Sequence, residues 1–292
     1  MSYAPDWAVQ GRGWPNRLHS RFVDAGRLRW HVQVMGAGPV LLLLHGTGAA
    51  THSWRALAPL LATDFTVVAP DLPGHGFTQG RPLGGLAMPA IARAMGELCQ
   101  ALDLSPRAIV GHSAGAAVAI RMALDGVAAP DKIVGLSAAL LPFPGLAARL
   151  FPTLARMLFV NPFAPHLFAR MARTPGEIER FLPRSTGSRI DAEGIRCYRA
   201  LFGTPGHCGG AITMMADWDL EALKRDLPRL KVPLLLLHGN GDSAISPANA
   251  CEAAAMVDGA AVLPLAGLGH LAHEERPDEV AALIRGFVGE LL

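Results

Sequence analysis

Short continuous apolar runs recur along the chain, and most of them are followed by a stretch with helical periodicity. A run without alternating polar residues is typical of a strand that is buried on both faces of a sheet. The predicted strands of this kind are GPVLLLLHG (38–46), FTVVAP (65–70), RAIVG (107–111), KIVGL (132–136), VPLLLLHG (232–239) and AAVLPL (260–265).

The segment RFVDAGRLRWHVQVMG (21–36) has a different pattern, because apolar and polar residues alternate on either side of Ala25-Gly26. That alternation predicts a β-hairpin. The helical segments between the buried strands are expected at about 54–62, 86–103, 114–125, 247–257 and 276–291. Strands that alternate with helices predict an α/β fold with a mostly parallel sheet that is covered on both faces.

This alternation is interrupted once, between about residues 141 and 210, where Pro-punctuated apolar helices replace the strands. An insertion of this length between two strand–helix units predicts a helical lid over the carboxyl edge of the sheet, where open α/β sheets bind ligands. We therefore expect a core made of residues 1–140 and 211–292, and a lid, or cap, made of residues 141–210.

Composition narrows the class of protein. Hydrophobic residues make up 51% of the chain and charged residues 17%, but Pro142, Pro144 and Gly145 interrupt the apolar stretch before Arg149, so no transmembrane segment is expected. The amino terminus lacks the pattern of a secretory signal, and four scattered cysteines fit reduced thiols, so we expect a cytoplasmic protein. A formal net charge of +2 without a dense basic run gives no indication of nucleic-acid binding.

Candidate chemistry begins with IVGHSAGAA (109–117), in which Ser113 stands between Gly111 and Gly115 at the expected junction of a strand and a helix. A nucleophilic serine on such a sharp turn needs small residues two positions away on each side. The pentapeptide alone is weak support, because the chain contains 32 glycines. Ser113 is predicted to be the nucleophile because the partners it would need also occur.

A serine hydroxyl needs a base, and the base needs a carboxylate that orients it. Asp242 follows the strand that ends near His238, and His270 lies in a Gly-rich turn after the last strand, in the chain order serine, acid, histidine. We predict that Ser113, His270 and Asp242 form the catalytic set. His273 remains an alternative base and Asp219 an alternative acid, although Asp219 is more readily explained as a helix cap.

The oxyanion of the reaction would need preorganised donors, and the predicted ones are the backbone N–H groups of Thr47 and Ala114. His112 is predicted to line the floor of the pocket, and His75 to brace the loop PDLPGHG (70–76). No metal site and no cofactor are predicted: the spacing of His270, His273 and Glu274 matches no zinc motif. His207 and Cys208 lack further ligands nearby.

The motifs HG (45–46), PDLPGHG, GHSAG (111–115) and GLGH (267–270) together resemble those of the α/β-hydrolase superfamily along nearly the whole chain. Segments outside the catalytic set, including HGTGAATHSWR, ALLPFPGLAARLFP, TGSRIDAEG and MMADWDL, resemble the magnesium-chelatase accessory proteins of bacteriochlorophyll biosynthesis (the BchO type). This resemblance implies an α/β-hydrolase fold and a role in or next to the metallation of a tetrapyrrole.

The resemblance also changes the interpretation of the lid. A tetrapyrrole would need an apolar slot with cations at its rim, whereas apolar residues at helical spacing more often pack on the protein itself. The lid residues that could form such a slot are Leu141, Phe143, Leu146, Phe151, Leu154, Phe159, Phe163 and Phe168, with Arg149, Arg156, Arg170 and Arg173. The same basic and apolar helices could rest on a membrane surface.

Three hypotheses follow for the function. The first is a serine hydrolase that acts on or binds a tetrapyrrole ester, with a magnesium porphyrin as the small-molecule substrate. The second is a non-catalytic accessory or porphyrin carrier protein that contacts magnesium chelatase. The third is a general cytosolic esterase, a carbon–carbon hydrolase or a cofactor-free haloperoxidase, since the same three residues serve each of these reactions.

Overall fold

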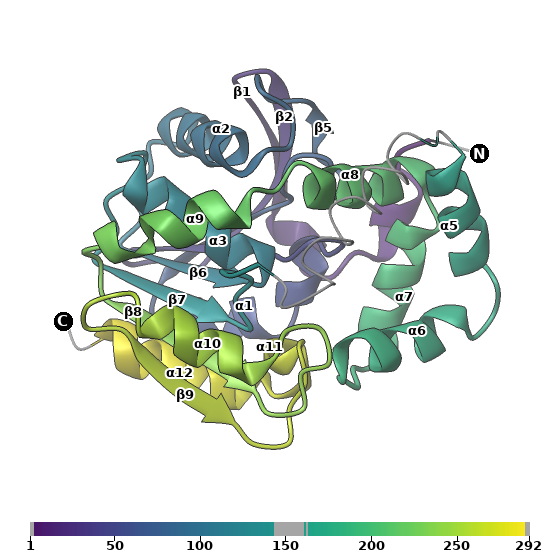
Figure 1. The fold of residues 1–292 in the computed structure, drawn as a ribbon. Helices are drawn as coiled ribbons and strands as arrows, with labels where there is room; N and C mark the ends of the chain where they lie inside the picture. The colour runs from purple at the N-terminus through teal and green to yellow at the C-terminus, as the bar shows by residue number, and fades with distance from the viewer. Residues whose placement is uncertain (1–2, 143–160, 162, 290–292) are drawn as a thin grey trace.

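The computed structural model describes residues 3–142, 161 and 163–289, and within them a single twisted sheet forms the centre of the molecule (Figure 1). Its strands are β1 (Ser20–Ala25), β2 (Leu28–Met35), β3 (Val40–Leu44), β4 (Thr66–Pro70), β5 (Gln79–Gly80), β6 (Ala108–His112), β7 (Lys132–Leu136), β8 (Leu234–Gly239) and β9 (Ala261–Leu265). The long strands are ordered β1-β2-β4-β3-β6-β7-β8-β9, and β5 pairs with β2.

The strand directions confirm a mostly parallel α/β sheet. Every pairing from β4 through β3, β6, β7 and β8 to β9 is parallel, whereas the pairings of β2 with β1, β4 and β5 are antiparallel. The predicted hairpin is present as β1 and β2, with its turn at Gly26-Arg27, one residue later than expected. Gly26 adopts φ 58°, a conformation that glycine enters at little cost.

Two helical layers explain why the central strands are continuously apolar. Leu42 and Leu44 of β3 point into one core with α2 (Met88–Ala101) and α3 (Ala114–Leu124), while Leu41 and Leu43 point into a second core on the opposite face. Successive side chains of a strand alternate between faces, so both must be apolar when both faces are covered. The other helices that cover the sheet are α1 (Leu57–Leu61), α10 (Pro247–Ala254), α11 (Ala272–Glu275) and α12 (Pro277–Gly289).

The last strand departs from its prediction. The run at 260–265 indicates a strand buried on both faces, yet in β9 only Leu265 is buried, and Leu263 is 41% exposed. The reason is position: β9 is the edge of the sheet and pairs only with β8. Pro264 fits there, because proline is tolerated on edge strands.

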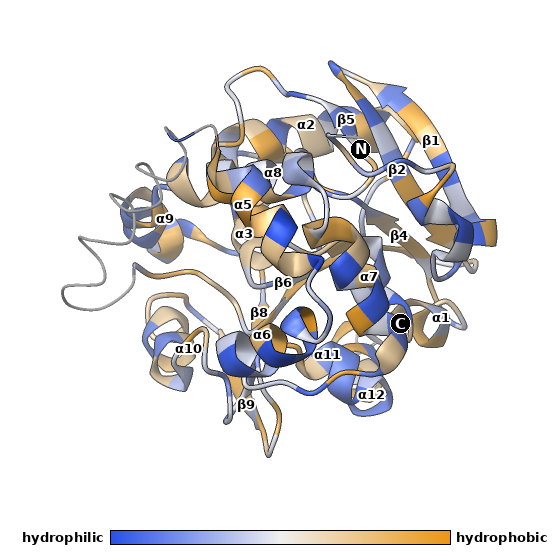
Figure 2. Ribbon diagram, turned by 90° about the vertical axis from the view of Figure 1, so that its right-hand side faces the viewer, coloured by the Kyte–Doolittle hydropathy of each residue, from blue (hydrophilic) through white to orange (hydrophobic). Residues whose placement is uncertain are grey.

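Between β7 and β8 the described residues form helices and no strand. We call these helices the helical insertion: α5 (Ala164–Ala172), α6 (Glu177–Thr186), α7 (Ala192–Phe202), α8 (Pro205–Ala216) and α9 (Leu220–Asp226). Figure 2 shows α5, α6 and α7 side by side on one side of the molecule. The predicted boundary between residues 210 and 211 falls inside α8, and the division of the chain into core and lid remains a prediction.

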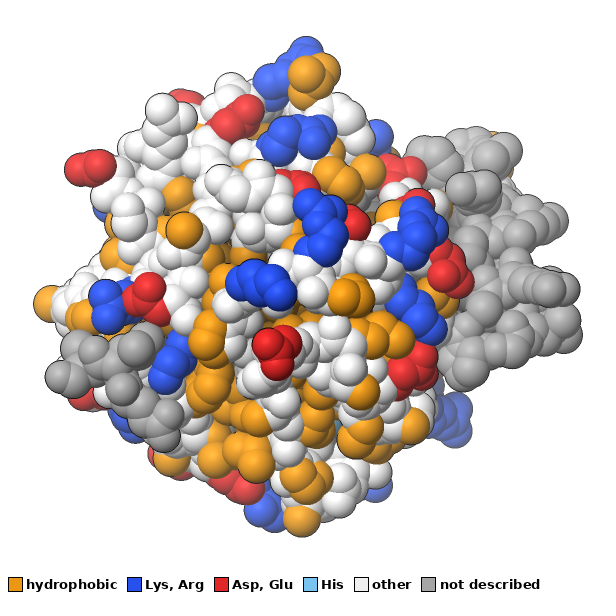
Figure 3. All heavy atoms as spheres, turned by 60° about the vertical axis from the view of Figure 1, so that its left-hand side comes forward, with side chains coloured by type: hydrophobic (Ala, Val, Ile, Leu, Met, Phe, Trp, Pro, Cys, Tyr) orange, Lys and Arg blue, Asp and Glu red, His pale blue; other side chains and the backbone are white. Residues whose placement is uncertain are grey.

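The surface carries charges of both signs. On the face drawn in Figure 3, acidic and basic side chains are interspersed and do not gather by sign. Among the residues described, none of the helices has the length and apolar character needed to cross a bilayer.

Candidate active site

Ser113 occupies a strained turn between β6 and α3. Its backbone has φ 49° and ψ −111°, and its N–H donates to the carbonyl oxygen of Leu136 on the neighbouring strand at 2.9 Å. The flanking glycines are required by contact: a Cβ atom at Gly111 would lie 2.3 Å from the nitrogen of Ala116, and one at Gly115 would lie 1.9 Å from the carbonyl oxygen of Leu44. A non-glycine residue in such a conformation is typical of a functional position.

Asp242 and His270 are joined by a buried hydrogen bond. Nδ1 of His270 lies 2.8 Å from Oδ2 of Asp242, although the residues are 28 positions apart in the chain. Asp242 follows β8, and its Oδ1 accepts from the backbone N–H groups of Ala244 and Ile245 at 2.8 and 2.9 Å. The loop after β8 therefore fixes the carboxylate, and the carboxylate fixes the imidazole.

The electrostatics keep Asp242 ionised. Burial acts to raise the pKa of this carboxyl, but the hydrogen bonds from His270, Ile245 and Ala244 favour the anion and hold the pKa below its usual range. An ionised carboxylate only accepts hydrogen bonds, so Nδ1 of His270 carries a proton. In the neutral ring, Nε2 is then free to act as a base.

The two alternative residues, His273 and Asp219, have other contacts in the structure. His273 is fully buried, its Nε2 lies 3.4 Å from Oγ of Ser53, and burial with the neighbouring His270 and Arg55 lowers its pKa to about 3. Asp219 is the N-cap of α9 and accepts from the N–H of Ala222 at 2.9 Å, as its alternative interpretation predicted.

The predicted oxyanion donors lie beside the serine. Ala114 is the first residue of α3, where backbone N–H groups have no partner within the helix. The loop with Thr47 approaches closely, since a Cβ atom at Gly46 would lie 3.1 Å from Cβ of Ser113. The Thr47 hydroxyl donates to Sδ of Met214 on α8 at 3.2 Å.

His112 lies behind the site. It is 3% exposed, its Nε2 donates to the carbonyl oxygen of His270 at 3.0 Å, and the two rings are 4.7 Å apart. Its assignment to the floor of the substrate pocket remains a prediction. Since His112 precedes Ser113 directly, this contact links the serine turn to the histidine loop.

Comparison with known proteins gives the family. A model of the alpha/beta hydrolase family matches residues 41–283. The chain belongs to the alpha/beta hydrolase family. It is 40% identical to the magnesium-chelatase 30 kDa subunit of Rhodobacter capsulatus, over 93% of this chain and 95% of that protein, which confirms the resemblance drawn from the sequence.

Solved structures agree on the fold. The epoxide hydrolase CorEH matches with a TM-score of 0.79 and 23% identity, over 94% of this chain and 99% of that one. A thermophilic esterase from Thermogutta terrifontis matches with a TM-score of 0.75 and 24% identity, over 93% and 98% of the two chains. Identities this low support the hydrolase fold and say nothing about the substrate.

In this alpha/beta hydrolase a segment that the sequence analysis did not assign to the site holds the histidine loop. The segment is Thr186–Arg189, which begins with the last residue of α6 and continues toward α7. The N–H of His270 donates to the carbonyl oxygen of Thr186, and the N–H of Leu271 donates to Oγ of Ser188, both at 2.8 Å. The N–H of Gly269 donates to Glu275, which also accepts from Ser188 and Arg189.

A buried ionic cluster makes a second connection between the insertion and the core. Glu274, four residues after His270, accepts from Arg55 and from the hydroxyl of Tyr198 on α7, the latter at 2.8 Å. Asp191, the N-cap of α7, also accepts from Arg55 at 2.8 Å. Burial raises the pKa of Glu274 to about 7 despite the neighbouring guanidinium. Thr186–Arg189 and Asp191 lie in TGSRIDAEG, which carries a family resemblance, but the sequence marks neither them nor Glu274 as part of a catalytic motif.

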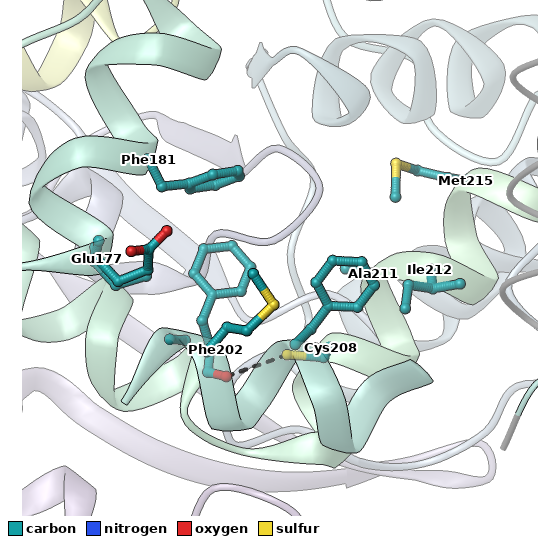
Figure 4. Close-up of a pocket in the computed structure, with 11 residues that line it drawn as sticks. Glu177, Phe181, Phe202, Cys208, Ala211, Ile212 and Met215 are labelled. Carbon is teal, nitrogen blue, oxygen red and sulfur yellow. Dashed lines mark hydrogen bonds between the residues drawn. The ribbon is translucent and has the colours of Figure 1, made fainter. Parts of the chain in front are cut away.

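Four helices of the insertion line an apolar cavity of about 270 Å³ that is open on one side (Figure 4). The described residues that line it are Phe168, Met171, Ala172, Glu177, Ile178, Phe181, Phe202, Cys208, Ala211, Ile212 and Met215. Of the residues suggested for a tetrapyrrole slot, Phe168 contributes to this wall. Phe143, Leu146, Arg149, Phe151, Leu154, Arg156 and Phe159 lie outside the described residues.

His75, His207 and Cys208, which the sequence analysis singled out, each make a hydrogen bond within the fold. His75 donates through Nδ1 to the carbonyl oxygen of Pro73, which confirms that it braces its loop. His207 uses both ring nitrogens, accepting from the N–H of Gly76 and donating to the carbonyl oxygen of Gly48, and Cys208 donates to the carbonyl of Phe202. Within the described ranges no three His, Cys, Asp or Glu side chains are grouped so that they could hold a metal ion.

Proposed function

We propose that this chain is a serine-dependent hydrolase that cleaves esters. The observation that carries the proposal is the buried 2.8 Å hydrogen bond between Asp242 and His270, on a loop that contacts the residue next to Ser113. The family and its esterase and epoxide hydrolase neighbours support a hydrolase in general. The assignment of Ser113, His270 and Asp242 as the catalytic set is part of the proposal.

The proposed reaction has two steps. Oγ of Ser113 attacks the ester carbonyl carbon while Nε2 of His270 takes the hydroxyl proton, and the N–H groups of Thr47 and Ala114 donate to the oxyanion. The tetrahedral intermediate expels the alcohol, which receives the proton from His270. A water molecule then attacks the acyl-serine and gives its proton to His270. The second tetrahedral intermediate collapses with release of the acid, and His270 returns the proton to Oγ of Ser113.

A p-nitrophenyl ester series tests this reaction. The wild-type protein is expected to release nitrophenolate with saturation kinetics, and Ser113→Ala is expected to lower kcat by about 10⁴-fold or more. The matched control is Ser105→Ala, because Ser105 is exposed and follows α2 away from the site. Equal rates for wild type and Ser113→Ala would overturn the proposal.

For the substrate class, we propose a tetrapyrrole ester such as a methyl ester of a magnesium porphyrin. The support is the similarity to the magnesium-chelatase 30 kDa subunit of Rhodobacter capsulatus, which covers the insertion as well as the core. Incubation with magnesium protoporphyrin monomethyl ester should yield the free acid by chromatography with wild type and not with Ser113→Ala. An unchanged ester in both samples would contradict this substrate class.

The same relative favours a second candidate, a non-catalytic accessory or porphyrin carrier that contacts magnesium chelatase. In this case Ser113→Ala should support magnesium insertion by chelatase as well as wild type does, and the porphyrin fluorescence should be quenched on titration with either protein. If a folded Ser113→Ala protein no longer supports magnesium insertion, this candidate is excluded.

The exposed face of α5 supports a contact with the membrane surface. Phe163 is 75% exposed, Leu167 and Met171 are also exposed, and Arg170 lies among them. Apolar side chains with a nearby cation favour binding to anionic lipid. Wild type should sediment with phosphatidylglycerol vesicles and Leu167→Glu should not, while Leu263→Glu on β9 serves as the control. Equal sedimentation of all three would contradict the contact.

A further inference from the structure

The cavity in the helical insertion adjoins the proposed active site. Phe202, which lines it, packs against the loop that carries Thr47, because a Cβ atom at Gly48 would lie 3.0 Å from its ring. Two further lining residues, Ala172 and Ile178, belong to one buried cluster with Ala49 and Leu271. Leu271 follows His270 directly, so the cluster that lines the cavity also packs against both loops of the site.

The wall of this cavity cannot solvate an anion. Ten of its eleven described residues are apolar or cysteine, and the Cys208 thiol already donates to the carbonyl oxygen of Phe202 at 3.2 Å. The one charged lining residue is the carboxylate Glu177, which Figure 4 shows at the side of the cavity near Phe181. Because Arg180 already pairs with Glu177 at 2.9 Å, a substrate carboxylate deep in the cavity would find no free hydrogen-bond donor among the lining residues.

We propose that this cavity binds the uncharged, hydrocarbon-rich arm of the substrate and rejects an arm that ends in a free carboxylate. That the bound molecule is the substrate rests on the proposed function. That the cavity prefers neutral to anionic molecules does not depend on it. Its volume of about 270 Å³ is at the small end of ligand sites, which fits one arm of a larger molecule. The rest of the substrate would extend through the open side of the cavity, where Phe168, Met171 and Phe181 are partly exposed.

This selectivity determines which substrates the proposed reaction accepts. An esterified arm is neutral and can enter the cavity, whereas a free acid arm carries a charge at neutral pH and is disfavoured there. None of Ser113, His270 and Asp242 lines the cavity, so the arm that it holds is not the one being cleaved. The class of substrate is then a neutral ester in preference to its diacid or half-acid counterpart.

A binding experiment on the full-length Ser113→Ala protein tests the cavity without any catalysis. The probe is N-phenyl-1-naphthylamine, a neutral dye that fluoresces in apolar surroundings, displaced by decan-1-ol or by decanoate at about pH 8, where decanoate is ionised. Decanol is expected to displace the dye at a concentration at least about tenfold lower than decanoate, in line with the cost of burying an unpaired charge.

Two substitutions at one position and a matched control locate the site. Phe181→Glu should weaken binding of both dye and decanol by about tenfold or more, and Phe181→Lys should shift the preference toward decanoate. Phe181 is 48% exposed, so either side chain can be accommodated on the folded protein. Leu263→Glu places the same charge at a residue of similar exposure, 41%, on β9 and should change neither affinity.

The outcomes separate this proposal from the one on catalysis. Equal displacement by decanol and decanoate, or unchanged affinity in Phe181→Glu, would overturn the cavity proposal even if ester hydrolysis is observed. Selective displacement in a protein that hydrolyses no ester would support the cavity and reject only the proposed reaction. Should Phe181→Glu fail to fold, the decanol-to-decanoate ratio and the response of Phe181→Lys still decide.

Discussion

The backbone N–H of His270 donates to the carbonyl oxygen of Thr186 at 2.8 Å. Thr186 ends α6, and its carbonyl also lies 3.4 Å from the N–H of Ser243, the residue after Asp242. One carbonyl of the helical insertion thus contacts the loops that carry the proposed base and its orienting acid. The geometry of the proposed catalytic set therefore depends on where α6 ends.

Gly187 is the residue of the insertion that packs most tightly against the loop carrying Asp242. A Cβ atom there would lie 2.0 Å from the carbonyl oxygen of Gly241, and Gly187 has φ 71°. We predict that Gly187→Ala displaces the Asp242 loop and lowers ester hydrolysis by about 100-fold or more, since small displacements at a catalytic set have such effects. Circular dichroism and the thermal midpoint would show whether the fold survives.

Gly259→Ala is the control for Gly187→Ala. Gly259 has the same φ of 71°, but a Cβ atom there would meet nothing within 4 Å. It should therefore cost about 1 kcal/mol of stability from backbone strain and leave hydrolysis unchanged. Similar losses of activity in the two variants would show that strain, and not contact with the Asp242 loop, is responsible.

Ser188 makes a separate contribution because its hydroxyl accepts from the N–H of Leu271 and donates to Glu275, both at 2.8 Å. Ser188→Ala leaves both groups without this partner, which typically costs about 1 to 3 kcal/mol. We expect kcat to fall while KM changes little, because the substituted side chain positions His270 and lies outside the cavity wall. A change confined to KM would mean that Ser188 acts through substrate binding.

The orienting role of Asp242 predicts a selective loss. Asp242→Asn keeps the size of the side chain, but its amide cannot hold the Nδ1–H tautomer of His270, and kcat should fall by about 10⁴-fold. Asp219→Asn is the matched control, because Asn is as good an N-cap as Asp for α9. Comparable losses in both variants would make Asp219 a genuine competitor for the acid.

The buried histidines predict how stability depends on pH. Burial lowers the pKa of His45 to about 4 and those of His75, His207 and His273 to about 3, so these residues bind protons only when the chain unfolds. Their contribution to stability is present above the unfolded pKa of about 6.5 and is lost as pH falls below it. The pKa of Glu274 is raised to about 7, so this residue makes the protein more stable as pH falls. Its effect is smaller than the combined effect of the four histidines.

Urea unfolding measures this balance. The free energy of unfolding should decrease between about pH 7 and pH 5, because the unfolded chain binds more protons than the folded one in this range. Glu274→Gln removes the opposing contribution, so the decrease should become steeper in that variant. A free energy of unfolding that is constant or higher at the lower pH would contradict the assignment of neutral buried histidines.

Much of the fold could be predicted because its signals are local. The apolar runs identified the long central strands, and Ser113, Asp242 and His270 were proposed as a catalytic set from their places after strands. The exposure of β9 could not be predicted, because a run of apolar residues does not reveal which strand forms an edge. The contacts of Thr186 and Ser188 with the His270 loop join residues more than 80 positions apart and follow no motif, so only the folded chain reveals them.

The reactivity of Ser113 is tested most directly by the mass of the intact protein after treatment with a fluorophosphonate, followed by mapping of the modified peptide. The account predicts one adduct on the peptide that contains Ser113 in the wild type, none in Ser113→Ala, and much slower modification of Asp242→Asn. No adduct on wild type, or an adduct that persists in Ser113→Ala, would contradict it.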